Sequence, residues 1–216
     1  MMLDSLLAKG MGKTRGDGAG GANTNTYGKA FEAKTCTLPR LVKQGYSFVY
    51  FSKPKSVPEP ALVPELIRPT MLKHGYLSQN NTSFVTQTGL KKYLKHVFAI
   101  EDLFRCPDEA FIRHALTPGA PTVVKILEKK EQRVEGSVET KLWSGPSLKR
   151  EYELLLGPQF KVEYAFCVNG YLKDKLHSGK RKYEILGTIL KEHNIQVLYG
   201  DDPDYFATLD DWVQRE

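Results

Sequence analysis

Hydrophobic and polar positions alternate along most of the chain in two periods. Short apolar and β-branched runs are typical of strands, whereas apolar residues recurring every three or four positions are typical of helices. We predict strands at 46–51, 109–112, 122–131, 160–168 and 195–199, and helices near 90–98, at 147–156 and at 181–192. This alternation favours an α/β fold, a single domain with a central mixed β-sheet flanked by helices.

The beginning of the chain departs from this pattern. Glycine and asparagine dominate from about 10 to 26, which predicts a flexible segment. Asn25 or Thr26 is placed to cap a helix that carries Phe31 on its apolar face and ends at Pro39.

Three further segments are defined by proline and polar residues. Five prolines predict an extended connection at about 53–70, and the polar run 78–83, SQNNTS, predicts an exposed tip before the helix near 90–98. Asp202-Pro203 is a typical start for a last helix. The apolar face of that helix comprises Phe206, Leu209 and Trp212.

Composition narrows the class of protein. The 216 residues suit one domain, here 1–216, and a net charge of +6 with a pI near 9.1 favours a polyanionic partner. No apolar run reaches the length of a membrane span or a signal peptide, so we expect a cytoplasmic protein without a membrane partner. Cys36, Cys106 and Cys167 fit neither a disulfide framework nor a zinc site and are expected to be reduced and buried.

Candidate chemistry is concentrated in the segment TVVKILEKKEQ, residues 122–132. On a strand, Glu128 and Lys130 project from the same face, and Gln132 follows on that face. Pro107-Asp108 precedes another short apolar segment, which predicts a second carboxylate on a neighbouring strand. Gly12-Lys13-Thr14 lacks the first glycine of a P-loop, so no nucleotide cofactor is expected.

The combination PD…ExK, formed by Asp108 with Glu128 and Lys130, resembles the active site of the PD-(D/E)xK nuclease superfamily and within it the type II restriction endonucleases. The tail GSVETKLW after this segment is similar to a restriction-enzyme-like subgroup. The resemblance spans roughly residues 108–169 and implies a restriction-endonuclease-like fold.

The resemblance also implies a catalytic apparatus. Asp108, Glu128 and the carbonyl of Lys129 would bind Mg²⁺, for which Mn²⁺ can substitute. Lys130 would stabilise the transition state or help to orient the attacking water. Gln132 would hydrogen-bond that water or the DNA backbone. A helix glutamate, here Glu32, would complete the site by binding a metal through water.

Structural readings compete with these assignments. The charged segment 128–131 is also compatible with a solvated edge strand, although the apolar run before it favours a central one. Asp108 also suits a turn cap, and Glu32 an ordinary helix surface. The second ExK, Glu139 to Lys141, looks structural, since a first-turn glutamate complements a helix dipole.

We therefore expect a Mg²⁺-dependent, site-specific endonuclease that cuts double-stranded DNA as a homodimer. Structure-selective or repair nucleases, an RNA-processing nuclease and a non-catalytic DNA-binding protein remain alternatives. Two groups of residues are candidates for DNA contact. Those for reading bases are Gln79, Asn80 and Asn81, and those for contacting phosphates are Lys180, Arg181 and Lys182.

Overall fold

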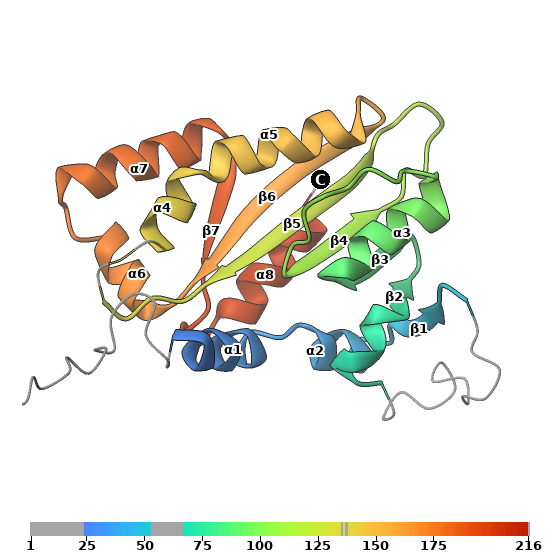
Figure 1. Cartoon of the computed structure of the whole chain (residues 1–216), viewed down its shortest axis with the longest axis horizontal. Coiled ribbons are helices and arrows are strands. Elements are labelled where there is room, and N and C mark those ends of the chain that lie inside the picture. The colour runs from blue at the N-terminus through green and yellow to red at the C-terminus, as the bar shows by residue number, and fades with distance from the viewer. Residues whose placement is uncertain (1–23, 53–66, 135, 137, 216) are drawn as a thin grey trace, which may run out of the picture.

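Seven strands form one mixed sheet in the computed structural model, which describes residues 24–52, 67–134, 136 and 138–215 (Figure 1). The order of the strands in the sheet equals their order in the chain. They are β1 (Ser47–Tyr50), β2 (Gly75–Gln79), β3 (Thr82–Thr86), β4 (Glu109–Arg113), β5 (Thr122–Lys130), β6 (Phe160–Val168) and β7 (Ile195–Tyr199). Neighbours from β1 to β5 are antiparallel, whereas β5, β6 and β7 are parallel.

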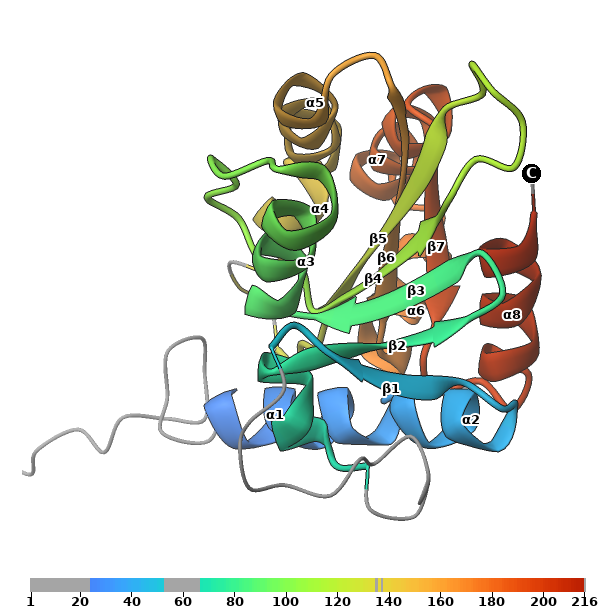
Figure 2. The same ribbon diagram turned by 90° about the vertical axis from the view of Figure 1, so that its right-hand side faces the viewer.

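Helices cover both faces of this sheet (Figure 2). One face packs against α1 (Thr24–Lys34), α2 (Leu38–Lys43) and α8 (Tyr205–Gln214). The other face packs against α3 (Thr88–Phe98), α4 (Val138–Trp143), α5 (Gly145–Leu156) and α7 (Arg181–Glu192). In the chain, α6 (Gly170–Leu176) follows β6. A short 3₁₀ helix, η3 (Pro69–Lys73), precedes β2. The fold is thus an α/β domain with helices on both sides of a mixed sheet.

The side chains of β5 point alternately to the two faces of the sheet and contribute to the hydrophobic core on each face. Val124 and Ile126 are buried with Tyr152 of α5 on one face, and Leu127 is buried with Trp212 of α8 on the other. Because side chains of a strand alternate between faces, Glu128 and Lys130 belong to the face covered by α3, α4 and α5.

Most predicted elements are confirmed, several of them to the residue. The predicted strands 160–168 and 195–199 and the helix 181–192 coincide with β6, β7 and α7. The polar tip at 78–83 proves to be the turn of a hairpin, in which β2 and β3 pair on either side of Asn80, whose φ is 51°. Neither strand of this hairpin, nor α6, was predicted.

The helix expected to end at Pro39 is in fact two helices. α1 ends at Lys34, and Pro39 lies in the first turn of α2, where a missing N–H costs no intrahelical bond. The segment predicted to be flexible lies outside the described residues up to 23, and 24–26 form the start of α1.

The predicted proline-rich connection is described only in part. Residues 53–66 lie outside the described residues, and Pro69 begins η3. The expectation that all cysteines are buried is wrong: Cys167 is buried, Cys36 is half-buried and Cys106 is exposed, although all three are free thiols. Of the helices described, none has the length and apolar character needed to cross a membrane.

A buried ion pair joins the α1–α2 junction to the sheet. Lys129 Nζ lies 2.7 Å from Glu109 Oε1 and donates to the carbonyl of Thr35 at 2.9 Å. The carboxylate of Glu109 also accepts hydrogen bonds from the backbone N–H and hydroxyl of Thr37. Every charged group of this cluster therefore has partners, as burial requires.

Candidate active site

Asp108 is positioned by the pairing of β4 with β5. Because Glu109 pairs with Leu127 in antiparallel register, the residue before β4 lies beside the end of β5. Asp108 Oδ2 accepts a hydrogen bond from the backbone N–H of Lys129 at 2.6 Å. The side-chain carboxylate of Asp108 thus accepts the backbone hydrogen bond of Lys129 at the point where the pairing of β4 with β5 has ended.

Lys130 connects the two carboxylates. Its Nζ lies 2.6 Å from Glu128 Oε2 and 3.7 Å from Asp108 Oδ2. The side chains of Asp108, Glu128 and Lys130 are 22, 17 and 15% exposed, so all three are largely buried but reachable from solvent. The structure thus brings together the three residues that form the PD…ExK pattern.

The alternative of a solvated edge strand for residues 128–131 does not describe the site. β5 is a central strand, paired with β4 along 123–127 and with β6 along 122–130, and although only β6 pairs with it beyond Leu127, the side chains of Glu128 and Lys130 are largely buried. A carboxylate at the end of a central strand is costly to bury without a partner, which is consistent with the ion pair to Lys130.

Burial raises the pKa of the Glu128 carboxyl above its ordinary value. The positive charge of Lys130 opposes this shift, the negative charge of Asp108 adds to it, and the positive charge of Lys141 of α4 also opposes it. Lys141 is an exposed member of the second ExK, and sequence analysis did not connect it with this site.

Glu32 of α1 belongs to the same electrostatic cluster. Burial raises the pKa of its carboxyl, repulsion from Asp108 raises it further, and Lys129 and Lys130 lower it. α1, which carries Glu32, packs closely against the residue that follows β7. A Cβ at Gly200 would lie only 2.6 Å from the ring of Phe31, the residue before Glu32. Asp108 thus interacts electrostatically with two carboxyl groups, those of Glu32 and Glu128.

Two tyrosines that the sequence did not point to lie close to this site. The hydroxyls of Tyr152 and Tyr164 are buried and have no hydrogen-bond partner among the described residues. Burial raises the pKa of both, and the charge of Glu128 raises each further. Tyr164 and Phe166 are two residues apart on β6 and share a face, whereas Tyr152 belongs to α5, and only the fold brings these residues close to Glu128.

The donor set fits a hard divalent cation such as Mg²⁺. Two carboxylates converge, and the carbonyl of Lys129 faces the same gap as its N–H, which binds Asp108. Magnesium requires few protein ligands because it retains several of its waters. Within the part of the chain that the structure describes, no group of three or more His, Cys, Asp or Glu side chains is arranged to hold a metal, so the fit depends on waters and that carbonyl.

Gln132 is placed differently from the prediction. β5 ends at Lys130, so Gln132 does not continue its face. Its side chain is buried and donates to the carbonyl of Val134 at 2.6 Å, and its backbone carbonyl accepts from Asn169 Nδ2 at 2.8 Å. Its Oε1 has no partner among the described residues. The prediction that it lies on the strand face is wrong because the chain leaves the sheet to meet the start of α6.

The predicted base-reading residues lie at the far end of β4 from Asp108. Asn81 Nδ2 donates to the carbonyl of His114, just past the end of β4, at 3.2 Å. Gln79 Nε2 donates to the carbonyl of Gln44 at 2.8 Å, and Asn80 is exposed at the turn. A role for these three residues in DNA contact stays a prediction, and it would concern a region separate from the carboxylates.

Lys180, Arg181 and Lys182 lie at the start of α7. Arg181 pairs with Glu184 of the same helix, and Lys182 pairs with Glu139. Glu139 is buried and also accepts a hydrogen bond from the Tyr183 hydroxyl at 3.0 Å, in agreement with the structural role expected for it. Phosphate contact by this basic run stays a prediction.

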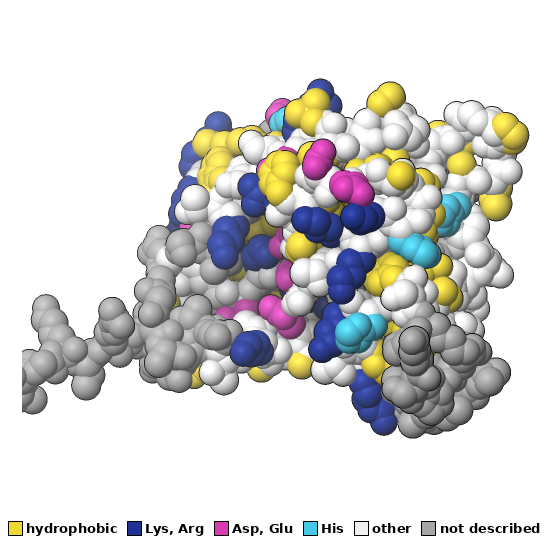
Figure 3. Space-filling view, turned by 45° about the vertical axis from the view of Figure 1, so that its right-hand side comes forward, with side chains coloured by type: hydrophobic (Ala, Val, Ile, Leu, Met, Phe, Trp, Pro, Cys, Tyr) yellow, Lys and Arg dark blue, Asp and Glu magenta, His cyan; other side chains and the backbone are white. Residues whose placement is uncertain are grey.

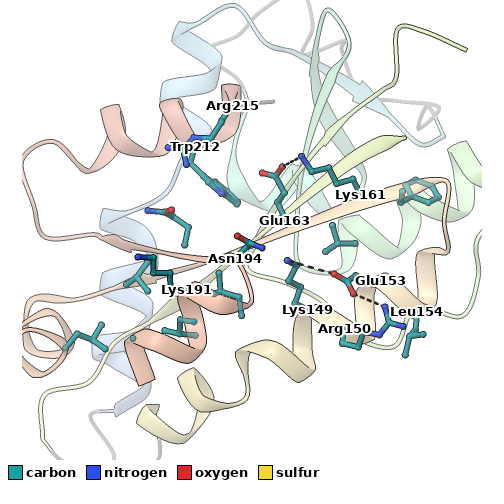
Figure 4. Close-up of a pocket in the computed structure, with 18 of the residues that line it drawn as sticks. Lys149, Arg150, Glu153, Leu154, Lys161, Glu163, Lys191, Asn194, Trp212 and Arg215 are labelled. Carbon is teal, nitrogen blue, oxygen red and sulfur yellow. Dashed lines mark hydrogen bonds and ion pairs between the residues drawn. The ribbon is translucent and has the colours of Figure 1, made fainter. Parts of the chain in front are cut away.

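A groove of about 1280 Å³ lies away from this chemistry, between α5, α7 and the edge strand β7 (Figure 4). It includes residues 160–163 at the beginning of β6, whereas Lys130 pairs with Val168 at the end of that strand. Its charged side chains largely neutralise one another, as Lys149 and Arg150 do with Glu153. We therefore place the candidate active site at the carboxyl end of β5.

Comparison with known proteins finds no match to this chain among family models, curated proteins or solved structures.

Proposed function

We propose that the protein is a Mg²⁺-dependent endonuclease that hydrolyses phosphodiester bonds in double-stranded DNA, with a restriction-endonuclease-like fold and a homodimeric, site-specific mode of action. The observation that carries the proposal is the convergence of Asp108, Glu128 and Lys130 at the ends of two adjacent strands.

Asp108, Glu128 and the carbonyl of Lys129 would hold the cation, and Glu32 would reach it through water. When bound, Mg²⁺ activates water and neutralises charge on the phosphate. Glu128 and Asp108 keep Lys130 oriented before DNA arrives, through contacts of 2.6 and 3.7 Å.

Lys130 would supply a positive charge next to the scissile phosphate. As the pentavalent transition state gathers negative charge, a fixed ammonium stabilises it more than it stabilises the ground state. The structure-based support is that Lys130 is held between two carboxylates yet remains partly exposed.

Plasmid digestion with Mg²⁺ tests the proposal. Glu128→Ala and Lys130→Ala should each lower cleavage by at least about 10²-fold, the size of effect seen when one group stabilising a transition state is removed. Lys161→Ala, at an exposed ion pair at the other end of β6, is the matched control and should cut as the wild type does.

Full activity in Lys130→Ala would refute the assignment. Discrete fragments from wild-type digestion support a site-specific enzyme, whereas degradation directed to flaps, mismatches or damaged sites would identify a structure-selective or repair nuclease with the same site.

A further inference from the structure

The solvent side of α3 is strongly basic. Leu90, Tyr93 and Leu94 are buried against the sheet, which leaves Lys91, Lys92 and Lys95 exposed on the opposite side. The helix, TGLKKYLKHVF, contains no acidic residue. Such a one-signed surface favours a polyanionic partner.

This helix begins beside the candidate active site. The backbone N–H of Gln87, immediately before α3, donates to the carbonyl of Pro107 at 2.9 Å, and Asp108 is the next residue. Thr86 of β3 pairs with Glu109 of β4, which fixes the same neighbourhood. The basic side of α3 therefore extends away from the carboxylates over about 16 Å, the length of an 11-residue helix.

Other cations extend this surface. Lys92 Nζ donates to the carbonyl of Lys73 at 2.6 Å, so the exposed Lys73 of η3 lies next to it. Arg105, in the loop 99–107, is half-exposed and pairs with Glu151. Figure 3 shows Lys and Arg side chains gathered in a band on this side of the molecule, with acidic side chains next to the band.

Resting on the proposed function, we infer that double-stranded DNA binds along α3, with Lys91, Lys92 and Lys95 against its phosphates and one strand directed to the site at Asp108. Phosphate contacts fix the position of a duplex on a protein without reading its sequence. The exposed pair of Lys95 with Glu101 does not prevent this contact, because such pairs are weak and exchange readily.

The surface on α3 differs from the two predicted from sequence. The hairpin turn at Asn80 lies at the opposite end of β4, and on α7 Lys182 pairs with the buried Glu139. α3 combines a side without acidic residues with a hydrogen bond from the residue before it to Pro107, which precedes Asp108.

Binding of a fluorescently labelled duplex, measured by anisotropy without divalent metal, tests this inference apart from catalysis. In the triple variant Lys91→Ala/Lys92→Ala/Lys95→Ala, the negative slope of log K against log salt concentration should become shallower by about 2.7, because each phosphate contact contributes about 0.9 to its magnitude. The dissociation constant at moderate salt should rise at least tenfold. Lys91→Arg/Lys92→Arg/Lys95→Arg should bind as the wild type does.

The control triple variant, Arg150→Ala/Lys161→Ala/Lys191→Ala, removes equal charge around the groove at the other end of the sheet and should keep the wild-type slope. An unchanged slope in the α3 variant, with circular dichroism showing a folded protein, would overturn the surface even if plasmid cleavage succeeds. Absence of any wild-type binding, or tighter binding to an RNA duplex of the same sequence, would also overturn it. Binding lost in the α3 variant without wild-type cleavage would support the surface and refute the nuclease.

Discussion

Glu128 carries the clearest conflict between stability and the proposed chemistry. A carboxylate that is buried beside Asp108 is more costly in the folded protein than in the unfolded chain, and Lys130 offsets only part of this cost. Carboxyl groups whose pKa is shifted by burial and by a neighbouring charge are typical of functional sites, although structural ion pairs also shift pKa values.

Replacing this carboxyl should stabilise the fold. Because the pKa of Glu128 is raised on folding, stability is lost as pH increases from the ordinary carboxyl pKa through the raised value. Glu128→Gln removes that loss, so the variant should melt a few degrees above the wild type at pH 8. In a protein of this size, a gain of ~1 kcal/mol corresponds to about 2–4 °C in melting temperature. Calorimetry between pH 4 and 8 measures the difference.

The difference should shrink toward pH 4, where both proteins carry a neutral side chain at position 128. Glu184→Gln, on the exposed side of α7, is the control and should melt as the wild type does at both pH values. A Glu128→Gln protein that is less stable than the wild type at pH 8 would show that the ion pair with Lys130 outweighs the burial.

At this scale, sequence predicted the residues that follow one another on a strand and missed those brought together by folding. The period of two placed Glu128 and Lys130 on one face, and the PD pair pointed to Asp108. Tyr152 and Lys141 belong to helices whose packing against β5 has no signature in the local pattern. Gln132 was misplaced because nothing in the sequence marks where β5 ends.

At the scale of elements, the pair Lys129–Glu109 is the connection between the helices α1 and α2 and the strands that carry the candidate site. Both residues are sequence neighbours of site residues, since Lys129 stands between Glu128 and Lys130 and Glu109 follows Asp108. Their side chains point to the opposite face of the sheet, toward Thr35 and the α1–α2 junction.

Removing one member of this pair should be strongly destabilising. Lys129→Met leaves the Glu109 carboxylate buried with only the N–H and hydroxyl of Thr37, and we expect the free energy of unfolding to fall by about 3–5 kcal/mol. Urea denaturation measures it. The double variant Lys129→Met/Glu109→Gln, which leaves no buried charge, should recover most of the loss, and equal losses in both variants would contradict this account.

Elements were predictable where a long run has one period. β6 and α7 show one period from end to end, and the five residues of β7 are mostly apolar, whereas β2 and β3, also of five residues each, mix polar with apolar positions. Pro39 was read as the end of one helix because proline stops a helix interior, but it equally suits the first turn of the next.

For the molecule as a whole, binding of the cation should raise the free energy of unfolding. If Mg²⁺ binds the folded state alone, a concentration of 100 times its dissociation constant adds about 2.7 kcal/mol to the free energy of unfolding. The wild type should therefore melt at a higher temperature with Mg²⁺ than with an equal ionic strength of NaCl. The double variant Asp108→Asn/Glu128→Gln should show no such increase, and an equal increase in both proteins would place the cation elsewhere.

The proposed homodimer, with one site per subunit, predicts a result for mixed subunits. Wild-type protein exchanged with an excess of Lys130→Ala subunits should convert supercoiled plasmid mainly to nicked circles, because each mixed dimer cuts one strand. Agarose electrophoresis distinguishes nicked from linear product. Linear product alone, at a rate that merely falls with dilution, would show that one subunit cuts both strands.

The order of the strands has a consequence for how the chain folds. Since every strand pairs with the strand before it in sequence, the sheet can grow by adding one strand at a time from either end, and no strand has to insert between two that are already paired. The antiparallel pairs from β1 to β5 are consequently more local in sequence than the parallel pairs of β5 with β6 and β6 with β7, which span crossover helices, and local contacts are associated with faster folding. The convergence of Asp108 and Glu128 then requires only that β4 pairs with β5, whichever end the sheet grows from.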